Sequence, residues 1–159
     1  DRQLWMEPSS SVARGGVWLR GATRVRGQPA GDLGVRLTAA FEEAFLEGAP
    51  WAAAVGTDAP AVDATMTIQA GELLATHEVA VVPAVDGGYA LIALKSAQPA
   101  LFTDIPWSTS QVLAATLKRA ESLGLRVALL PAVHDVDTAE DLLNFPVLRP
   151  RSGPSATRP

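Results

Sequence analysis

Apolar residues recur at helical spacing in the first half of the chain. Between Asp32 and Gly48, large apolar residues follow one another every four positions, so they lie along one face of a helix. This apolar stripe consists of Leu33, Leu37, Phe41 and Phe45. Asp32 is suited to cap the helix at its N-terminus and Gly48 to end it, so the pattern predicts a helix over 32–48.

A second helix is predicted in the other half of the chain. The S-x-x-Q spacing from Ser108 to Gln111 is typical of a capping box, and an apolar stripe follows it as far as Gly124. Weaker patterns predict helices over 64–76 and 139–145.

Short apolar runs predict the strands. They cover 2–8, 51–57, 77–84, 87–94 and 125–131. The run at 51–57 is apolar almost throughout, as in a strand that is buried on both faces. The glycine-containing segment 17–32 fits either short extended pieces or turns. Because strands alternate with helices, the order of elements predicts a layered α/β fold with a mostly parallel sheet.

Composition narrows the class of protein. The 159 residues, 48% of them hydrophobic, suffice for one domain with its own core. We assign this domain to 1–145 and expect 146–159 to be a disordered tail, because that segment has little apolar surface. A net charge of −4 without a basic stripe argues against binding to a nucleic acid polymer.

The types of residue that are missing also restrict the chemistry. Without cysteine there is no disulfide, no thiolate metal site and no cysteine nucleophile, which fits a cytoplasmic location. No apolar run reaches the roughly 20 residues that a membrane span requires. The chain begins with Asp1 and not with Met, so we expect it to start inside a longer reading frame.

Aspartates follow three of the predicted strands. Asp58 comes after 51–57, Asp86 after 79–83, and Asp135 and Asp137 after 125–131. In parallel sheets, ligands bind beyond the carboxyl ends of the strands, so these acids are expected at one edge. Carboxylates that converge repel one another unless a proton or a cation bridges them. Oxygen ligands without cysteine favour Mg²⁺ or Mn²⁺ over zinc.

The neighbouring residues fit a site, but each has a simpler interpretation. Gly56 would shape the loop around Asp58, and Gly87 with Gly88 would let the backbone approach a ligand closely. However, a single acid at a strand end is more often a helix cap or a turn former, and this holds for Asp58 taken alone. Trp107 likewise either packs under its loop or lines a pocket.

Three stretches resemble one bacterial family. They read GTDAP (56–60), VVPAVDGGYALIAL (81–94) and LFTDIPWSTSQVLAATLKRAESLGLRVALLPAVHDVDTAEDL (101–142). They are similar to the glycosyltransferase A-like family called selenodomain-associated transferase, formerly a domain of unknown function. This resemblance implies a three-layer α/β/α sandwich of the nucleotide-diphospho-sugar transferase type. It also implies a nucleotide-sugar or nucleotide donor that is held with Mg²⁺ or Mn²⁺.

The resemblance also implies roles for particular residues. Asp58 matches the metal-binding acid beside the donor diphosphate, and Asp137 or its neighbour Asp135 matches a second ligand position. Asp86 lies where the acceptor side is expected and is a candidate general base. The candidate substrate-binding residues are Gly56, Thr57, Gly87, Gly88, Tyr89 and Trp107.

The chain departs from the family pattern at its start. Relatives begin with an apolar strand and a basic phosphate loop, and neither is present, so the fold is expected to be N-terminally incomplete. The sheet would then have an uncovered edge, which favours a homodimer or an added strand. Relatives commonly have Glu, Tyr and Cys in place of Val85, Ala90 and Ala59.

Three functions follow as hypotheses. The first is a metal-dependent glycosyltransferase that uses a nucleotide-sugar donor and is weakened or inactive without the phosphate loop. The second is a non-catalytic remnant that acts as a binding or assembly module. The third is a nucleotidyltransferase.

Overall fold

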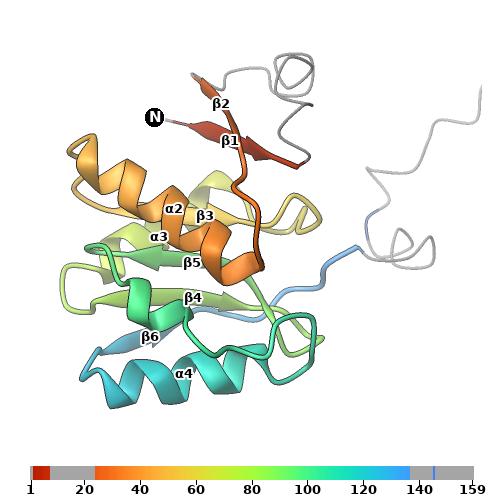
Figure 1. The fold of residues 1–159 in the computed structure, drawn as a ribbon. Coiled ribbons are helices and arrows are strands. Elements are labelled where there is room, and N and C mark those ends of the chain that lie inside the picture. Colours follow the sequence, from red (N-terminus) through yellow and green to blue (C-terminus); the bar gives the residue numbers. More distant parts are fainter. Residues whose placement is uncertain (1, 8–23, 137–144, 146–159) are drawn as a thin grey trace, which may run out of the picture.

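The computed structural model describes residues 2–7, 24–136 and 145. They form a four-stranded sheet of order β3-β5-β4-β6 and a separate two-stranded sheet, β1-β2 (Figure 1). The strands are β1 (Gln3–Met6), β2 (Arg24–Gly27), β3 (Ala52–Val55), β4 (Val79–Pro83), β5 (Tyr89–Leu94) and β6 (Val127–Leu129). The helices are α2 (Leu33–Leu46), α3 (Ala64–Leu73), α4 (Val112–Ser122) and the short 3₁₀ helix η2 (Pro99–Phe102).

The helix α2 confirms the clearest sequence pattern. The Asp32 side chain accepts a hydrogen bond of 2.9 Å from the backbone N–H of Val35 and so caps the helix. Gly48 follows the last turn with a φ of +86°, a conformation that favours glycine. The helix therefore begins and ends where its capping residues predict.

The prediction of a mostly parallel sheet is wrong for two of the three neighbouring pairs of the four-stranded sheet. The strands β3, β4 and β6 run in the same direction, but β5 lies antiparallel between β3 and β4. The reason is the short connection 84–88, because only antiparallel strands can be joined by so tight a turn. The described fold is therefore a mixed α/β arrangement.

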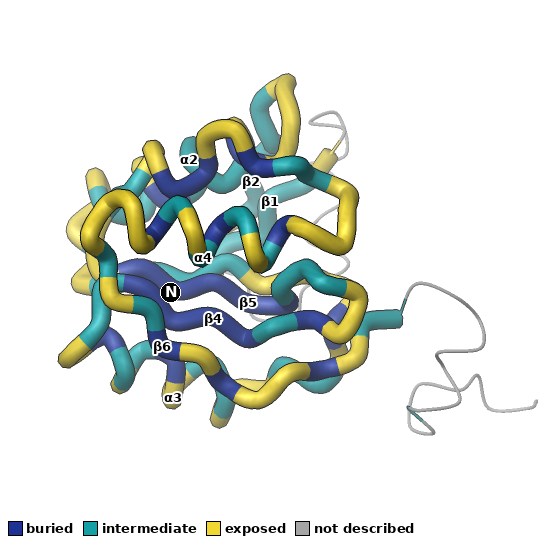
Figure 2. Tube along the Cα trace, turned by 90° about the horizontal axis from the view of Figure 1, so that it is seen from below, coloured by how far each residue is buried: buried dark blue, intermediate teal, exposed yellow. Residues whose placement is uncertain are grey.

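The four-stranded sheet is covered by helices on both faces (Figure 2). Alternate residues of β4 and β5 point to opposite faces, so each strand contributes to two cores. The α3 face includes Ala80, Val82, Leu91 and Ala93. The face toward α2 and α4 includes Val79, Val81, Ile92 and Leu94. Both strands are therefore buried on both faces.

The strand β3 is less buried than the sequence predicts. Its residues Ala52, Ala53 and Ala54 are partly exposed and Val55 is exposed. The cause is its place at the end of the strand order, where β5 is its one partner among the described residues. An apolar run therefore does not prove burial on both faces.

The capping box predicted at Ser108 is also wrong. The helix α4 begins at Val112 after Gln111, which makes no side-chain capping bond. Ser108 has a φ of +61°, whereas a residue that caps a helix normally has an extended backbone. Thr109 organises this turn instead, since its hydroxyl donates to Pro106 O at 2.7 Å and accepts from Gln111 N at 3.2 Å.

The two-stranded sheet contacts α2 through charged side chains. β1 and β2 pair in parallel. Arg24 and Arg26 of β2 form ion pairs with Glu47, and Arg26 also pairs with Glu43 of α2 at 2.6 Å. β2 is thus a strand within the segment 17–32, for which the sequence fits either short extended pieces or turns.

Some sequence predictions cannot be compared with the structure. The predicted helix over 139–145 and the predicted tail over 146–159 lie outside the described residues, apart from residue 145. Among the residues that are described, no helix is long and apolar enough to cross a membrane.

The Phe41–Phe102 contact is expected to contribute strongly to stability. Phe41 is 3% exposed, and the two rings stack with centroids 5.7 Å apart. Phe41→Ala should lower the free energy of unfolding by about 3–5 kcal/mol because it leaves a cavity between α2 and η2. Leu46→Ala, in the same helix at a residue that is 88% exposed, should change it by less than about 0.5 kcal/mol. Urea unfolding measures both, and equal effects would contradict the packing described.

Glu78 should make the fold sensitive to acid. Hydrogen bonds from Arg126, including Nη2 to Oε1 at 2.7 Å, hold the pKa of Glu78 at about 2, below its ordinary value of 4.5. The charged pair therefore stabilises the fold above about pH 4.5, and this contribution is lost as the pH falls toward 2. In Glu78→Gln, the free energy of unfolding measured with urea should fall less between about pH 5 and about pH 3 than it does in the unaltered chain. An unchanged acid profile would count against this pair.

Candidate functional site

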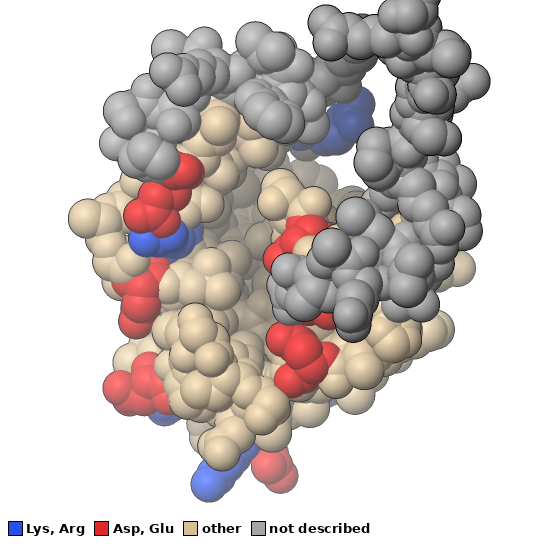
Figure 3. Space-filling view, turned by 90° about the vertical axis from the view of Figure 1, so that its right-hand side faces the viewer, with Lys and Arg blue, Asp and Glu red and all other residues tan. Residues whose placement is uncertain are grey.

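A pocket opens at the carboxyl edge of the four-stranded sheet, which we call the edge pocket. The loops after β3, β4 and β6 meet there, because these strands run in the same direction. The pocket has a volume of about 460 Å³, and acidic side chains border it on the face shown in Figure 3. It is lined by Leu33, Asp58, Ala59, Ala84, Asp86, Gly88, Tyr89, Ala90, Trp107, Ser108, Thr109, Val112 and Asp135.

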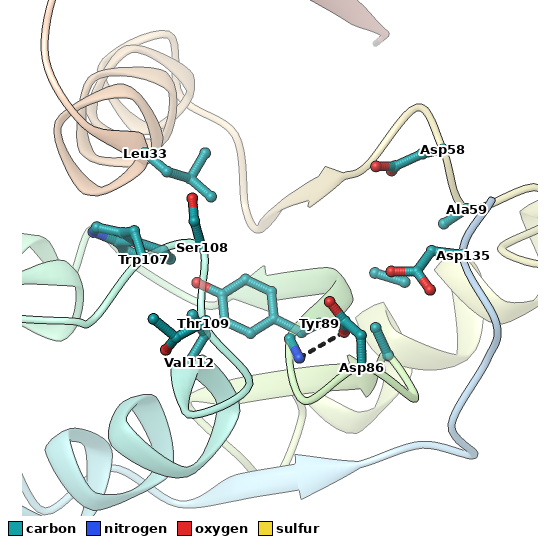
Figure 4. A pocket seen from close by; sticks show the side chains of 13 residues that line it. Leu33, Asp58, Ala59, Asp86, Tyr89, Trp107, Ser108, Thr109, Val112 and Asp135 are labelled. Atoms are coloured by element: carbon teal, nitrogen blue, oxygen red, sulfur yellow. Dashed lines mark hydrogen bonds between the residues drawn. The ribbon is translucent and has the colours of Figure 1, made fainter. Parts of the chain in front are cut away.

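The pocket has two chemically different sides (Figure 4). One side carries Asp58, Asp86 and Asp135, which we call the acidic wall. The other side carries Trp107, Ser108 and Thr109, which belong to the segment 103–111 that we call the wall loop, and Leu33 and Val112 at the beginnings of α2 and α4. The Tyr89 ring lies between the two sides. None of the described lining residues is Lys or Arg.

Asp86 is oriented by the turn that joins β4 to β5. One of its oxygens, Oδ1, accepts a hydrogen bond of 2.8 Å from the backbone N–H of Gly88. The turn is closed by a bond from Gly87 N to Ala84 O at 3.2 Å and by one from Ala84 N to Gly88 O at 3.1 Å. The carboxylate is thus fixed by a local Asx-type turn at the pocket edge.

The Asp58 side chain lies beside the glycine two positions before it, Gly56. A Cβ added to Gly56 would lie 2.5 Å from Asp58 Oδ1, so the carboxylate occupies the space that a side chain would fill. The backbone of Asp58 accepts a bond of 2.9 Å from Val136 N, which ties the loop to the segment after β6. The Asp58 carboxylate thus lies next to Gly56, and Gly56 does not itself line the pocket.

Asp135 reaches the acidic wall on the segment after β6. This segment is joined to β4 by bonds from Val133 N to Pro83 O at 2.9 Å and from Val85 N to Val133 O at 3.0 Å. Asp137 lies outside the described residues. Within those residues, no group of three or more His, Cys, Asp or Glu side chains is arranged to hold a metal ion.

Tyr89 contributes a neutral hydroxyl. Its ring meets the Trp107 ring edge to face, with centroids 6.4 Å apart. Burial raises the pKa of the Tyr89 hydroxyl well above its ordinary value of 10.0, and the Thr116 hydroxyl opposes this with a smaller effect. Neither hydroxyl has a partner with good hydrogen-bond geometry among the described residues. Tyr89 therefore stays protonated near neutral pH.

The structure gathers most, but not all, of the residues that the sequence suggests. Asp58, Asp86, Gly88, Tyr89, Trp107 and Asp135 line the edge pocket. Gly56, Thr57 and Gly87 are not among its lining residues, and a Cβ added to Gly87 would meet the Ser110 backbone. The roles of all these residues remain predictions.

The sequence misses several residues of the opposite wall. The sequence pattern predicts Ser108 as a helix cap and Leu33 as part of an apolar helical stripe, but both line the pocket, and Leu33 is 46% exposed. Thr109 and Val112 also belong to this wall. The sequence feature that indicates this wall is the hydroxyl-rich run Ser108-Thr109-Ser110, directly after a Pro-Trp pair.

Comparison with known proteins identifies a family and structural relatives. Residues 1–109 match the model of a family described as uncharacterized protein conserved in bacteria, DUF2064. A crystal structure from Desulfovibrio desulfuricans G20, described as a proposed nucleotide-diphospho-sugar transferase, is similar with a TM-score of 0.81 and 28% identity. The match covers 90% of this chain and 64% of that protein, so the chain spans less than two thirds of its relative. None of the curated proteins compared with the chain matches it.

Tyr89 can be titrated directly, because it is the single tyrosine of the chain. In denaturant its tyrosinate absorbance should appear near pH 10, whereas in the native chain it should appear at higher pH. Because the folded pKa is raised, the stabilising effect of the neutral hydroxyl is complete below pH 10 and is lost as the pH rises further. Tyr89→Phe should abolish the signal. A native midpoint equal to that in denaturant would show that the hydroxyl is not buried.

Proposed function

This chain belongs to the bacterial family described as uncharacterized (DUF2064), and from that premise we propose that it is a metal-dependent transferase that uses a nucleotide-sugar donor. The observation that carries the proposal is the edge pocket, where the loops after three strands bring aspartates together opposite an aromatic and hydroxyl-bearing wall. Ligands of α/β sheets bind at this edge. The likeness to the Desulfovibrio protein supports the same type of donor.

The proposal includes a three-layer sandwich of the glycosyltransferase A type. It is supported by the packing of α3 on one face of the sheet and of α2 and α4 on the other. The antiparallel β5 is part of this proposed architecture and forms the floor of the site through Tyr89 and Ala90.

The proposed cation is Mg²⁺ or Mn²⁺. Asp58 and Asp135 would hold it, with Asp137 as a further candidate, because carboxylate oxygens are the ligands that these hard cations prefer. Mg²⁺ usually takes one or two protein carboxylates and completes its shell with water and substrate phosphates. The described acids fit this pattern, since they share a pocket without forming a three-residue cluster. When bound, such a cation stabilises the negative charge of a leaving diphosphate.

The protein side chains would divide the remaining tasks. Asp86, fixed by the Gly88 N–H, is the proposed general base for an acceptor hydroxyl. Trp107 and the protonated Tyr89 offer aromatic surface to a sugar ring, and Ser108 and Thr109 offer hydroxyls for hydrogen bonds. Thr57, which directly precedes Asp58 in the loop after β3, is also proposed to contact the substrate. Each group would bind or orient the substrate, or accept a proton.

A second candidate function is a module that binds a ligand or a partner without catalysis. It is favoured by the lack of Lys and Arg among the described lining residues, because transfer from a diphosphate depends on positive charge. Metal-free binding of a sugar would support this alternative. Release of pyrophosphate from a nucleoside triphosphate would instead support nucleotidyl transfer.

The proposal can be tested by thermal shift with donors. We expect one of the UDP-, GDP-, CDP- or dTDP-linked sugars to raise the Tm in the presence of Mn²⁺, because a ligand that binds the native state stabilises it. Asp58→Asn should weaken this binding at least about tenfold, or ~1.4 kcal/mol. Asp104→Asn is the matched control, since Asp104 is not among the lining residues and its side chain is 81% exposed.

Three results would contradict the proposal. They are the absence of any shift with Mn²⁺ and every donor, a shift that Asp58→Asn leaves unchanged, and an equal loss in Asp104→Asn. Manganese alone is included as an arm, so that binding of the cation is separated from binding of the donor.

A further inference from the structure

The wall loop passes between two glycines that are distant in sequence. Gly34 lies in the first turn of α2 and Gly87 lies in the turn between β4 and β5. Each glycine is in close contact with residues at or next to the wall loop. These contacts set the position of one side of the edge pocket.

The contact at Gly87 is with backbone. A Cβ on Gly87 would overlap Ser110 O and would lie 2.8 Å from Ser110 Cα, closer than real Cβ atoms approach other atoms. Gly87 also has a φ of +96°, which favours glycine. Its carbonyl accepts a bond of 2.9 Å from Leu113 N, so the turn that carries Asp86 is joined to the first turn of α4.

The contact at Gly34 is with the other end of the loop. A Cβ there would lie 2.6 Å from Phe102 O and 2.9 Å from Trp107 Nε1. Gly34 is buried, so the backbone of α2 lies directly against this part of the chain. A side chain at position 34 would push either the Trp107 indole or the Phe102 backbone away from the helix.

The loop between these contacts has an unusual backbone. Asp104 and Ser108 both have positive φ, at 57° and 61°. Such conformations persist where the surroundings determine them. Arg119 contributes a further restraint, because its Nη2 donates to Thr103 O at 2.9 Å.

We propose that Gly34 and Gly87 are positioning residues that clamp the wall loop and thereby fix the spacing between Trp107 and Asp86. Gly87 adjoins Asp86 in sequence and contacts Ser110 in space, so a displacement there moves the acidic wall relative to the wall loop. The inference concerns the shape of the pocket and holds for any ligand. Its consequence for sugar transfer rests on the proposed function.

The test uses Gly34→Ala and Gly87→Ala with matched controls. Gly48 and Gly124 also have positive φ, at +86° and +70°, but a Cβ on either would meet nothing within 4 Å. Gly48→Ala and Gly124→Ala therefore carry the same type of backbone strain without the contact. An alanine inside a helix ordinarily stabilises it, so a loss of stability in Gly34→Ala would itself indicate the contact.

The readout is the ¹⁹F spectrum of chains labelled with fluorotryptophan, in which Trp107→Phe assigns the Trp107 signal. We expect Gly34→Ala and Gly87→Ala to shift this signal. Both controls should leave this signal in place even where they lower the Tm. Signals in Gly34→Ala and Gly87→Ala that coincide with those of the controls would overturn the proposal.

Hydrogen exchange on the unaltered chain provides a measurement that needs no variant. The Leu113 amide, which donates to Gly87 O, should exchange as slowly as amides in the middle of α4. If the Leu113 amide exchanges at the rate of an unprotected amide, the hydrogen bond that joins the turn to α4 is not formed, and the proposal is wrong. No donor or metal is involved, so failure of the proposed function leaves this test unaffected.

Discussion

The short turn from Ala84 to Gly88 is the constraint on which the rest of the structure depends. It is too short to let β5 run parallel to β4, so β5 returns antiparallel and lies between β3 and β4. The first residue of β5, Tyr89, is thereby placed at the same edge as the ends of the other three strands. The pocket exists there because one antiparallel strand starts where three strands of the opposite direction end.

β4 and β5 are buried on both faces, so packing on both sides supports this edge of the sheet. One face packs small side chains such as Ala80 and Ala93 against α3, whereas the other carries Val81, Ile92 and Leu94 under α2 and α4. The stacked Phe41 and Phe102 rings link α2 to η2, directly before the wall loop. The core and one wall of the pocket are therefore held by the same contacts.

The sequence predicts most elements of this fold correctly because periodicity and capping act locally. The 3.6-residue stripe and Asp32 define α2, and short apolar runs define the strands. The family resemblance is confirmed by the match over residues 1–109 and by the structural relative. The sequence also places Asp58, Asp86 and Asp135 at strand ends, and the structure brings these three residues into one pocket.

Two errors, at Ser108 and Gly87, arise where distant contacts decide the conformation. Ser108 has the right spacing for a helix cap, but the loop that contacts Gly34 and Gly87 turns its backbone to positive φ. The sequence predicts that Gly87 leaves room for a ligand, whereas the space beside it is occupied by the Ser110 backbone. Such crowding depends on residues more than twenty positions away, so no local pattern contains it.

The distribution of charge across the edge pocket connects its shape to the proposed chemistry. The acidic wall repels a diphosphate unless positive charge stands between them, and the described lining residues supply none. A divalent cation on Asp58 would reverse the sign of the potential at that wall, while the pocket-lining residues of the wall loop, Trp107, Ser108 and Thr109, are uncharged and suited to a sugar ring. The nucleotide diphosphate and the sugar would then occupy different sides of the pocket.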